Sequence, residues 1–196
     1  MLDKNIPYAG FFMCRSGGRP LPPLPPLPEG YKFAFYKDGD EISWAKLETS
    51  VLEFESEFAA LMRFKQDYFL DVNELYNRCV FIEDDVGNKV ATGTAWWGDI
   101  ENKRRPWIQW ISVCPQHQGK GLGKAVIARV AEVLLELEGD VDMILKTQTW
   151  SYKAIKIYKA LGFEPTDEKA LYRNGDIDCN YKKAMKILKK LDRVMA

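Results

Sequence analysis

A glycine-rich turn between a strand pattern and a helix pattern is the segment of this sequence best suited to bind an anion. The turn spans residues 118–123, follows a β-branched and aromatic run over 107–113, and opens onto a helix pattern that continues to Leu137. The first N–H groups of a helix have no intrahelical partner, the helix dipole adds partial positive charge there, and glycines let a phosphate approach the backbone. The sequence therefore predicts a phosphate-binding site at the start of this helix.

The spacing of the turn excludes two common nucleotide loops. A P-loop needs a glycine, four residues and then Gly-Lys-Ser/Thr, but here Gly123-Lys124 has Gln118 at the first glycine position and Ala125 at the hydroxyl position. A dinucleotide-binding Gly-x-Gly-x-x-Gly that starts at Gly119 would end on a lysine. The pattern that remains is Gln-x-x-Gly-x-Gly, preceded by a strand that Pro115 ends because proline has no N–H to donate.

A second motif follows one helix later. Residues 142–149 have the pattern of a strand, Ser151 is suited to cap the next helix, and Gly162 is a natural residue for the left-handed end of that helix. Between them, Tyr158 shares a helical face with apolar neighbours and is followed by a Gly-Phe turn.

These two motifs, in this order, resemble the signatures of the GNAT superfamily of N-acyltransferases over roughly residues 90–165. The resemblance implies an α/β (α+β) chain with the GNAT acyl-CoA N-acyltransferase fold, in which helices flank a central mixed, mostly antiparallel sheet. The residue patterns alone predict the same order of elements. We expect strands at 31–36, 79–83, 89–97, 107–113 and 142–149, helices at 41–51, 56–78, 122–137 and 152–161, and a polar turn at 98–106.

Residues 1–30 are predicted to form a Pro-rich arm packed on a single domain that spans 31–196. A short strand is expected over 8–13, and the prolines of 19–28 require an extended chain. Pro-x-x-Pro spacing is also typical of ligands of SH3-like grooves, which would make the chain an adaptor. We favour a stiff connector whose leucines pack onto the domain.

The C-terminal region departs from the family, whose members commonly end in strands. The sequence predicts a last strand over 170–173, a turn at 174–176 and an amphipathic, lysine-rich helix over 178–195. A basic helix of this kind contacts a membrane surface or an acidic partner, or is simply a solvated face, and we favour the solvated face.

Composition argues against several classes of partner. The 196 residues include 28 basic and 28 acidic side chains, so bulk charge favours neither nucleic acid nor a membrane. No apolar run reaches the ~18–20 residues of a membrane span and the N-terminus has no secretory pattern, so we expect a cytoplasmic protein. Four cysteines without a Cys-x-x-Cys pair and a single histidine, His117, lead us to expect no metal site and free thiols.

The resemblance implies direct transfer of an acetyl group from acetyl-CoA to a primary amine of a small molecule or peptide. It implies that the backbone of Ile111 and Val113 pairs with the pantetheine arm, that an N–H near Ser112 or Val113 stabilises the oxyanion, and that the glycine-rich turn holds the pyrophosphate of coenzyme A. The cofactor-binding residues implied in this way are Ile111, Ser112, Val113, Gln118, Gly119, Lys120, Gly121, Leu122, Gly123, Lys124 and Ser151.

For the chemical step, the resemblance implies a general acid but leaves no evident base. Tyr158 matches the position of the family's general acid and would protonate the leaving thiolate, although a tyrosine here also suits a hydrophobic core. Some family members carry a carboxylate on the strand before the loop, where this chain has Gln109 between tryptophans. Asp99 and Glu101 are the nearest acids before that strand and are weak candidates for the base. Otherwise a chain of water molecules removes the amine proton, or the amine arrives neutral.

The acceptor side is left open by the sequence. Glu53 and Glu55 fall between the first two helices and either attract a cationic amine or are solvated, which we favour. A set of tryptophans on neighbouring strands either lines the acceptor pocket or packs in the core; these are Trp96, Trp97, Trp107 and Trp110. A catalytically idle module that senses acyl-CoA is the alternative function, and a homodimer is also left open.

Overall fold

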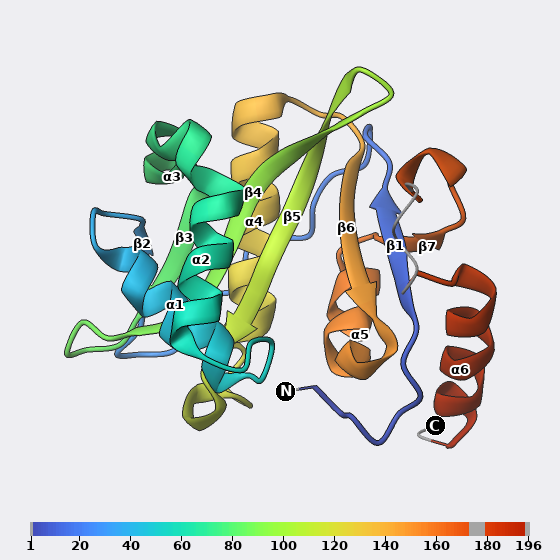
Figure 1. The fold of residues 1–196 in the computed structure, drawn as a ribbon, viewed down its shortest axis with the longest axis horizontal. Helices are drawn as coiled ribbons and strands as arrows, with labels where there is room; N and C mark the ends of the chain where they lie inside the picture. Colours follow the sequence, from blue (N-terminus) through green and yellow to red (C-terminus); the bar gives the residue numbers. More distant parts are fainter. Residues whose placement is uncertain (1, 173–178, 195–196) are drawn as a thin grey trace.

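Seven strands form one mixed sheet in the order β2-β3-β4-β5-β6-β1-β7, with helices on both faces (Figure 1). The computed structural model describes residues 2–172 and 179–194. The strands are β1 (Gly10–Arg15), β2 (Lys32–Phe35), β3 (Cys79–Glu83), β4 (Lys89–Ile100), β5 (Lys103–Val113), β6 (Met143–Gln148) and β7 (Glu164–Thr166). The helices are α1 (Asp40–Ser50), α2 (Glu57–Tyr68), α3 (Val72–Arg78), α4 (Leu122–Glu138), α5 (Tyr152–Ala160) and α6 (Tyr181–Val194). The expected α/β fold is confirmed.

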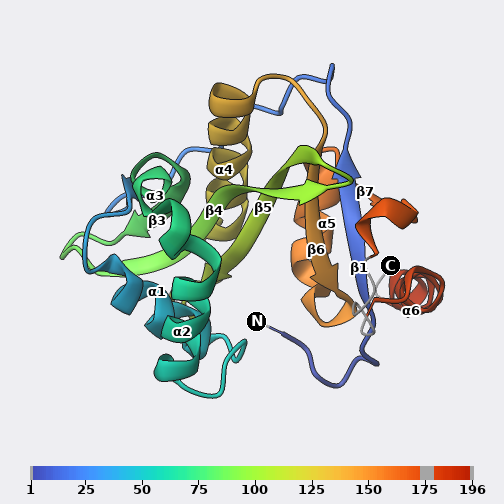
Figure 2. The same cartoon turned by 45° about the horizontal axis from the view of Figure 1, so that its top comes forward.

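The two faces of the sheet are covered by different helices (Figure 2). The apolar side of α4, with Val126 and Val130 fully buried, packs with α5 on one face. On the other face, Trp44 of α1 and Phe64 of α2 form a second, aromatic core. The predicted periodicity of α4 is therefore confirmed as a core-facing stripe.

Strands β5 and β6 run parallel but stay paired over only two residue pairs, Trp107 with Ile144 and Ile108 with Leu145. Beyond that point they diverge and leave a gap in the middle of the sheet (Figure 1). The gap is where an extended ligand can add to the free edge of β5.

A bulge in β5 accompanies this divergence. Trp110 has a left-handed φ of 50°, and the β4–β5 register shifts between Thr92 and Thr94. Gly93, opposite the bulge, has no room for a side chain, because a Cβ there would lie 2.3 Å from Ile111 Cδ1. Gly93 therefore marks a close approach between β4 and the bulge.

The N-terminal thirty residues contain both a strand and a surface segment. Strand β1 inserts between β6 and β7, antiparallel to both, and its Phe11 and Met13 are fully buried. The following Pro-rich segment packs three side chains against the main core, namely Leu21, Leu24 and Leu27. Its leucines therefore contact the domain as the connector hypothesis expects.

Three expected elements differ in the structure. The helix expected over 56–78 is divided by a 3-10 turn at Phe69–Asp71, which lets α2 and the buried Leu75 of α3 pack on the same aromatic core. The polar turn expected over 98–106 is wrong: β4 and β5 continue to a two-residue hairpin turn, Glu101 and Asn102, both with positive φ. Charged residues in that stretch misled the prediction because their side chains form surface ion pairs from within strands.

The strand expected over 170–173 is also wrong for its described part. Residues Lys169–Leu171 form a 3-10 turn, and Leu171 packs on Phe12 of β1, which already occupies the sheet position beside β6. Residue 173 and the turn expected at 174–176 lie outside the described residues. The expected C-terminal helix is confirmed as α6. Within the described chain, none of the helices is both long and apolar enough to cross a membrane.

Candidate active site

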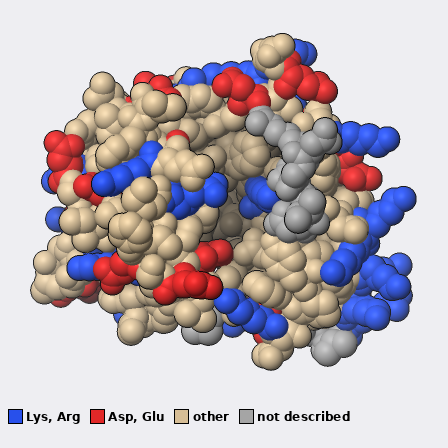
Figure 3. All heavy atoms as spheres, in the orientation of Figure 1, with Lys and Arg blue, Asp and Glu red and all other residues tan. Residues whose placement is uncertain are grey.

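Two cavities adjoin the gap between β5 and β6, where the surface is hollowed (Figure 3). The loop cavity has a volume of about 390 Å³ and lies between the glycine-rich turn, the start of α4 and α5. The sheet cavity has a volume of about 330 Å³ and lies between β5, β6, α1 and α2. Glu53, Ile111 and Ser151 line both, so the cavities meet at these residues.

The glycine-rich turn has the geometry of an anion site. Gly119 and Gly121 have φ values of 79° and 84°, a region that other residues rarely adopt. Gln118 donates from Nε2 to the carbonyl oxygen of Val113 at 2.9 Å and ties the turn to β5. The first helical bond of α4 is Ala125 N–H to Gly121 O, so the N–H groups of the three residues before Ala125 have no intrahelical partner at the cavity wall.

The edge of β5 beside the gap carries backbone groups suited to an extended ligand. The N–H of Cys114 donates to Val90 O at 2.8 Å across the β4–β5 pair. Because backbone groups alternate along a strand, those of Val113 point to the opposite edge, toward the gap. The side chain of Ser112 points to neither edge but into the aromatic core, where it meets α1.

Most of the predicted cofactor-binding residues line the loop cavity. They are Ile111, Ser112, Val113, Gln118, Gly119, Gly121, Leu122, Gly123, Lys124 and Ser151. Lys120 does not: its Nζ donates to Tyr31 Oη at 2.7 Å, and that hydroxyl contacts His117 Nδ1 at 2.9 Å. Ser151 occupies the position before α5, but its side chain does not cap the helix in the described structure and faces the cavities instead.

Tyr158 reaches the sheet cavity from α5 and is only 7% exposed. Burial, reinforced by the nearby carboxylates of Glu53 and Glu48, raises the pKa of the phenol above its ordinary range. The group therefore keeps its proton at neutral pH, which suits a proton donor. The apolar face of α5 holds it in place through Ile155, so Tyr158 is both a packed residue and a cavity residue.

A buried acid in helix α1 is the feature that sequence reasoning missed. Glu48 is fully buried and lines the sheet cavity, and Ser112 Oγ donates to its Oε2 at 2.9 Å. Burial raises the pKa of this carboxyl to about 8. The sequence does carry a signal, because Glu48 lies four residues after Trp44 on the inner face of a predicted helix, where an acid is out of place.

The other acids expected near the site have different surroundings. Glu53 accepts from Gln148 Nε2 at 3.3 Å and borders both cavities; its side chain is open to solvent, yet the surrounding protein raises its pKa by desolvation. Glu55 lines neither cavity. Asp99 and Glu101 lie at the far hairpin end of β4 and β5 and also line neither.

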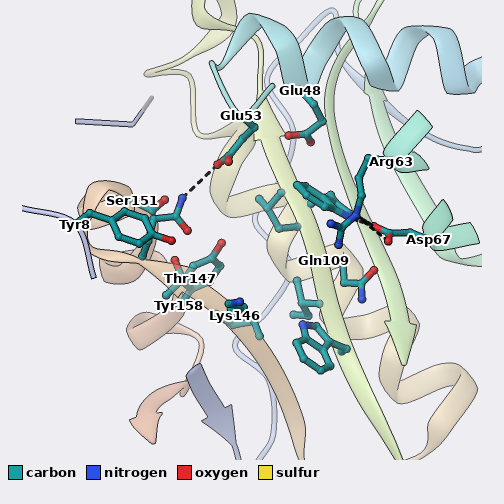
Figure 4. Close-up of a pocket in the computed structure, with 16 residues that line it drawn as sticks. Tyr8, Glu48, Glu53, Arg63, Asp67, Gln109, Lys146, Thr147, Ser151 and Tyr158 are labelled. Carbon is teal, nitrogen blue, oxygen red and sulfur yellow. Dashed lines mark hydrogen bonds and ion pairs between the residues drawn. The ribbon is translucent and has the colours of Figure 1, made fainter. Parts of the chain in front are cut away.

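The tryptophans divide between the two roles that the sequence left open. Trp107 and Trp110 line the sheet cavity, and Trp110 Nε1 donates to Asp67 Oδ2 at 2.9 Å. Asp67 in turn accepts from Arg63 Nε at 2.8 Å, so both charges are fixed in the cavity wall (Figure 4). The other two, Trp96 and Trp97, stack on each other at 4.3 Å in the packing around the sheet.

The N-terminal segment closes one side of both cavities. Leu2 lines the loop cavity and Tyr8 lines the sheet cavity. Backbone and indole hydrogen bonds fasten the segment to the turn before α5: Asp3 N–H donates to Trp150 O at 3.0 Å, and Trp150 Nε1 donates to Ile6 O at 2.6 Å. Residues before β1 thus contribute to the site.

Comparison with known proteins identifies the family. The profile described as the acetyltransferase (GNAT) family matches residues 31–163, about two thirds of the chain. The chain belongs to this family. A similar segment occurs in thialysine N-epsilon-acetyltransferase of Mus musculus, 37% identical over 65 residues, which are 33% of this chain and 38% of that protein. N-acetyltransferase family 8 member 3 of Mus musculus is 34% identical over 58 residues, 30% of this chain and 25% of its own.

Solved structures agree on the fold of this GNAT family member. A GCN5-related N-acetyltransferase from Sphaerobacter thermophilus superposes with a TM-score of 0.64 at 19% identity, covering 82% of this chain and 49% of that one. A GNAT-family acetyltransferase from Colwellia psychrerythraea gives 0.61 at 13% identity, covering 82% and 54%. The chain thus spans about half of these structures and less than two fifths of the sequence relatives.

Proposed function

We propose that this GNAT family member is an acyltransferase that moves an acetyl group from acetyl-CoA to a primary amine of a small molecule or peptide. The observation that carries the proposal is the junction of the two cavities, with an anion-binding turn on one side and Tyr158 on the other. Family membership supports the same chemistry.

Two features of the loop cavity support coenzyme A as the donor. The N–H groups of Leu122–Lys124 suit the pyrophosphate, and the free edge of β5 suits the amides of the pantetheine arm. A donor held this way carries its acetyl group to Ile111, where the cavities meet. The N–H of Val113 faces the gap and is the donor we assign to the oxyanion.

Tyr158 is the proton donor in this proposal. The C–S bond of the tetrahedral intermediate breaks to give a coenzyme A thiolate, which takes a proton from the phenol. A raised pKa keeps the phenol protonated until the thiolate forms beside it. Ser151 lines both cavities, and we assign its hydroxyl a hydrogen bond to the same part of the donor.

The acceptor enters through the sheet cavity. Its lining includes the acids Glu48 and Glu53, which can attract a cationic amine, and the aromatic faces of Trp107 and Trp110. Asp67 is already paired with Arg63, and Lys146 also lines the cavity. The mouse relative is named as an acetyltransferase of the ε-nitrogen of thialysine. We propose an acceptor of the same general kind, a primary amine at the end of a flexible chain.

A catalytically idle module that only binds acyl-CoA is the alternative. Such a module needs the loop cavity and has no use for a buried phenol and a buried acid beside a second cavity. These groups are costly to bury and are typical of reaction sites, so we do not favour the alternative.

The test is a release assay for the free thiol of coenzyme A. Purified protein receives acetyl-CoA and, separately, thialysine, L-lysine, spermidine, putrescine and a lysine-containing peptide, while calorimetry measures coenzyme A binding. We expect binding together with acceptor-dependent thiol release and a product heavier by one acetyl group. Tight binding without release above the acceptor-free rate for every amine would favour the idle module.

A further inference from the structure

Glu48 is an acid whose environment offers no structural reason for a carboxylate. It is 0% exposed, and the only described hydrogen bond to its carboxyl group comes from Ser112 to Oε2. The other oxygen, Oε1, has no hydrogen-bond partner, and among the described residues no lysine or arginine forms an ion pair with the group. A buried carboxylate normally has both oxygens satisfied or a cation beside it.

No cation is among the described groups that shift the pKa of Glu48. Arg63 and Lys146 line the same cavity, but neither forms an ion pair with Glu48, and Arg63 is bound to Asp67. Glu53 comes from the loop after α1, Tyr68 from α2 and Tyr158 from α5. All three are neutral or negative, so Oε1 of Glu48 stays without a partner until a donor enters the cavity that Glu48 lines. A protonated amine is such a donor.

The arrangement of acid and phenol suits a proton acceptor and a proton donor. Figure 4 shows Glu48 reaching from α1 toward β5 on one side of the cavity, while Tyr158 rises from α5 on the other. The gap between β5 and β6 lies between them. An amine on the Glu48 side and a thioester on the Tyr158 side would therefore meet across the gap.

We propose that Glu48, held by Ser112, is the catalytic base that deprotonates the acceptor ammonium, so that the base comes from helix α1 and not from strand β5. This inference rests on the acetyl transfer proposed above. It explains how the chain dispenses with an acid on β5, where Gln109 accepts from Tyr68 Oη at 3.2 Å instead.

The proton balance of the step is complete with these two side chains. The ammonium R–NH₃⁺ gives one proton to Glu48, and the nitrogen lone pair then forms the C–N bond to the thioester carbonyl. The C–S bond breaks, and the thiolate takes the phenol proton of Tyr158. The nitrogen loses its second proton to the phenolate, and Glu48 returns the first to solvent. The net products are the acetamide, coenzyme A thiol and one proton.

The carboxyl is also poised for this task. With a pKa raised to about 8 by burial, the base is a far better proton acceptor than an exposed glutamate, and Ser112 moderates the rise by stabilising the charged form. An entering cation stabilises the charged form further. The rate with subsaturating amine should therefore rise with pH up to about 8.

The experiment compares Glu48→Gln and Glu48→Asp with the matched control Glu55→Gln, an exposed acid that lines neither cavity. The probes are thialysine, L-lysine, spermidine, putrescine and the lysine peptide, and the readouts are kcat, KM and their pH profiles. We expect Glu48→Gln to lose about 10²- to 10⁴-fold in kcat and the rise toward pH 8. Coenzyme A affinity should stay within twofold, Glu48→Asp should keep part of the rate, and the control should match wild type.

The outcomes separate this inference from the proposed function. If wild type turns over an amine and Glu48→Gln keeps the rate within about threefold with the same pH profile, the base lies elsewhere and the inference is wrong. If wild type turns over none of the probes, the proposed function fails and the inference fails with it. The thermal unfolding temperature of Glu48→Gln tests whether misfolding causes the lost activity. We expect it to be no lower than that of wild type, because removing a buried carboxylate should not destabilise the fold.

Discussion

The loop cavity and the sheet cavity are built on different principles. Much of the loop cavity is lined by the stretch from β5 through the glycine-rich turn into α4, where glycines have positive φ and the first amides of α4 are unpaired, and residues near the N-terminus, after α1 and in α5 complete it. The sheet cavity is made of side chains from α1, α2, β5, β6 and α5, which are far apart in the chain. If the proposed function holds, the first cavity binds the donor common to the family, while the second can vary its side chains and its acceptor.

The two cavities also differ in the chemical groups that they present. The start of α4 brings unpaired N–H groups to the wall of the loop cavity, and such groups can bind phosphate without a titratable side chain. The sheet cavity buries Tyr158 and Glu48, whose pKa values are both raised. Our proposal thus assigns donor binding and proton transfer to different cavities, and substitutions on the two sides should separate affinity from turnover.

The largest effect should come from Tyr158→Phe. Loss of the hydroxyl removes the proton for the thiolate, and we expect kcat to fall about 10²- to 10⁴-fold while coenzyme A affinity stays within twofold. Steady-state thiol release and calorimetry measure the two quantities. Tyr152→Phe is the matched control on the same helix, because its hydroxyl donates to Asp192 away from the cavities. Equal losses in both variants would mean that α5 packing matters and the phenol proton does not.

Stability should show the cost of the buried acid. Glu48 has a folded pKa of about 8, above the unfolded value, so folded protein keeps a proton that unfolded protein loses as pH rises. The stabilisation that comes from this retained proton is present at low pH and is lost as pH rises from about 4 to about 8. Glu48→Gln should therefore be as stable as wild type at pH 4 and more stable by a few kcal/mol above pH 8.

Denaturant unfolding at several pH values measures this difference. Glu55→Gln is the control, because it shows how the unfolding free energy changes with pH when an exposed acid is removed. If the unfolding free energies of Glu48→Gln and wild type differ by the same amount at every pH from 4 to 9, the carboxyl of Glu48 titrates near its ordinary value. A gain in stability together with a loss of turnover would mark Glu48 as an acid kept for function.

Gly121→Ala should weaken donor binding by about tenfold, because a side chain at φ 84° costs roughly 1–2 kcal/mol and shifts the amides that follow. Gly87→Ala is the control, since it adds the same strain at φ 88° in the β3–β4 turn. Both variants should lose similar thermal stability, and only Gly121→Ala should lose coenzyme A affinity in calorimetry. Equal affinities would mean that the turn does not hold the pyrophosphate.

The contrast between the cavities also explains what the sequence could predict. The glycine-rich turn, the helix after it and Tyr158 are local patterns, and the structure has them where the spacing predicts. Strand β1 could be found as a strand but not as a neighbour of β6 and β7, since partner choice is not encoded in alternation. Glu48 was missed because its meaning depends on Ser112, 64 residues away.

Glu53→Gln should have a modest effect on the acceptor alone. Glu53 stands where the cavities meet, open to solvent, and its charge attracts a cationic amine without being needed for proton transfer in our proposal. We expect KM for spermidine or thialysine to rise about three- to tenfold with kcat nearly unchanged, an effect that salt reduces. A loss in kcat as large as that expected for Glu48→Gln would instead indicate that Glu53 is the base.

The smallest effect distinguishes two lysines of the same turn. Lys124 lines the loop cavity, whereas Lys120 is bound to Tyr31 outside it. In our proposal the backbone amides carry most of the phosphate binding. Lys124→Ala should therefore weaken coenzyme A binding only two- to fivefold at low salt, or by about 0.4–1 kcal/mol, and higher salt should reduce the loss because the side chain is exposed. Lys120→Ala should leave affinity unchanged. A larger loss for Lys120→Ala would show that its side chain leaves Tyr31 to meet the ligand, and that the loop cavity, like the sheet cavity, depends on side-chain charge.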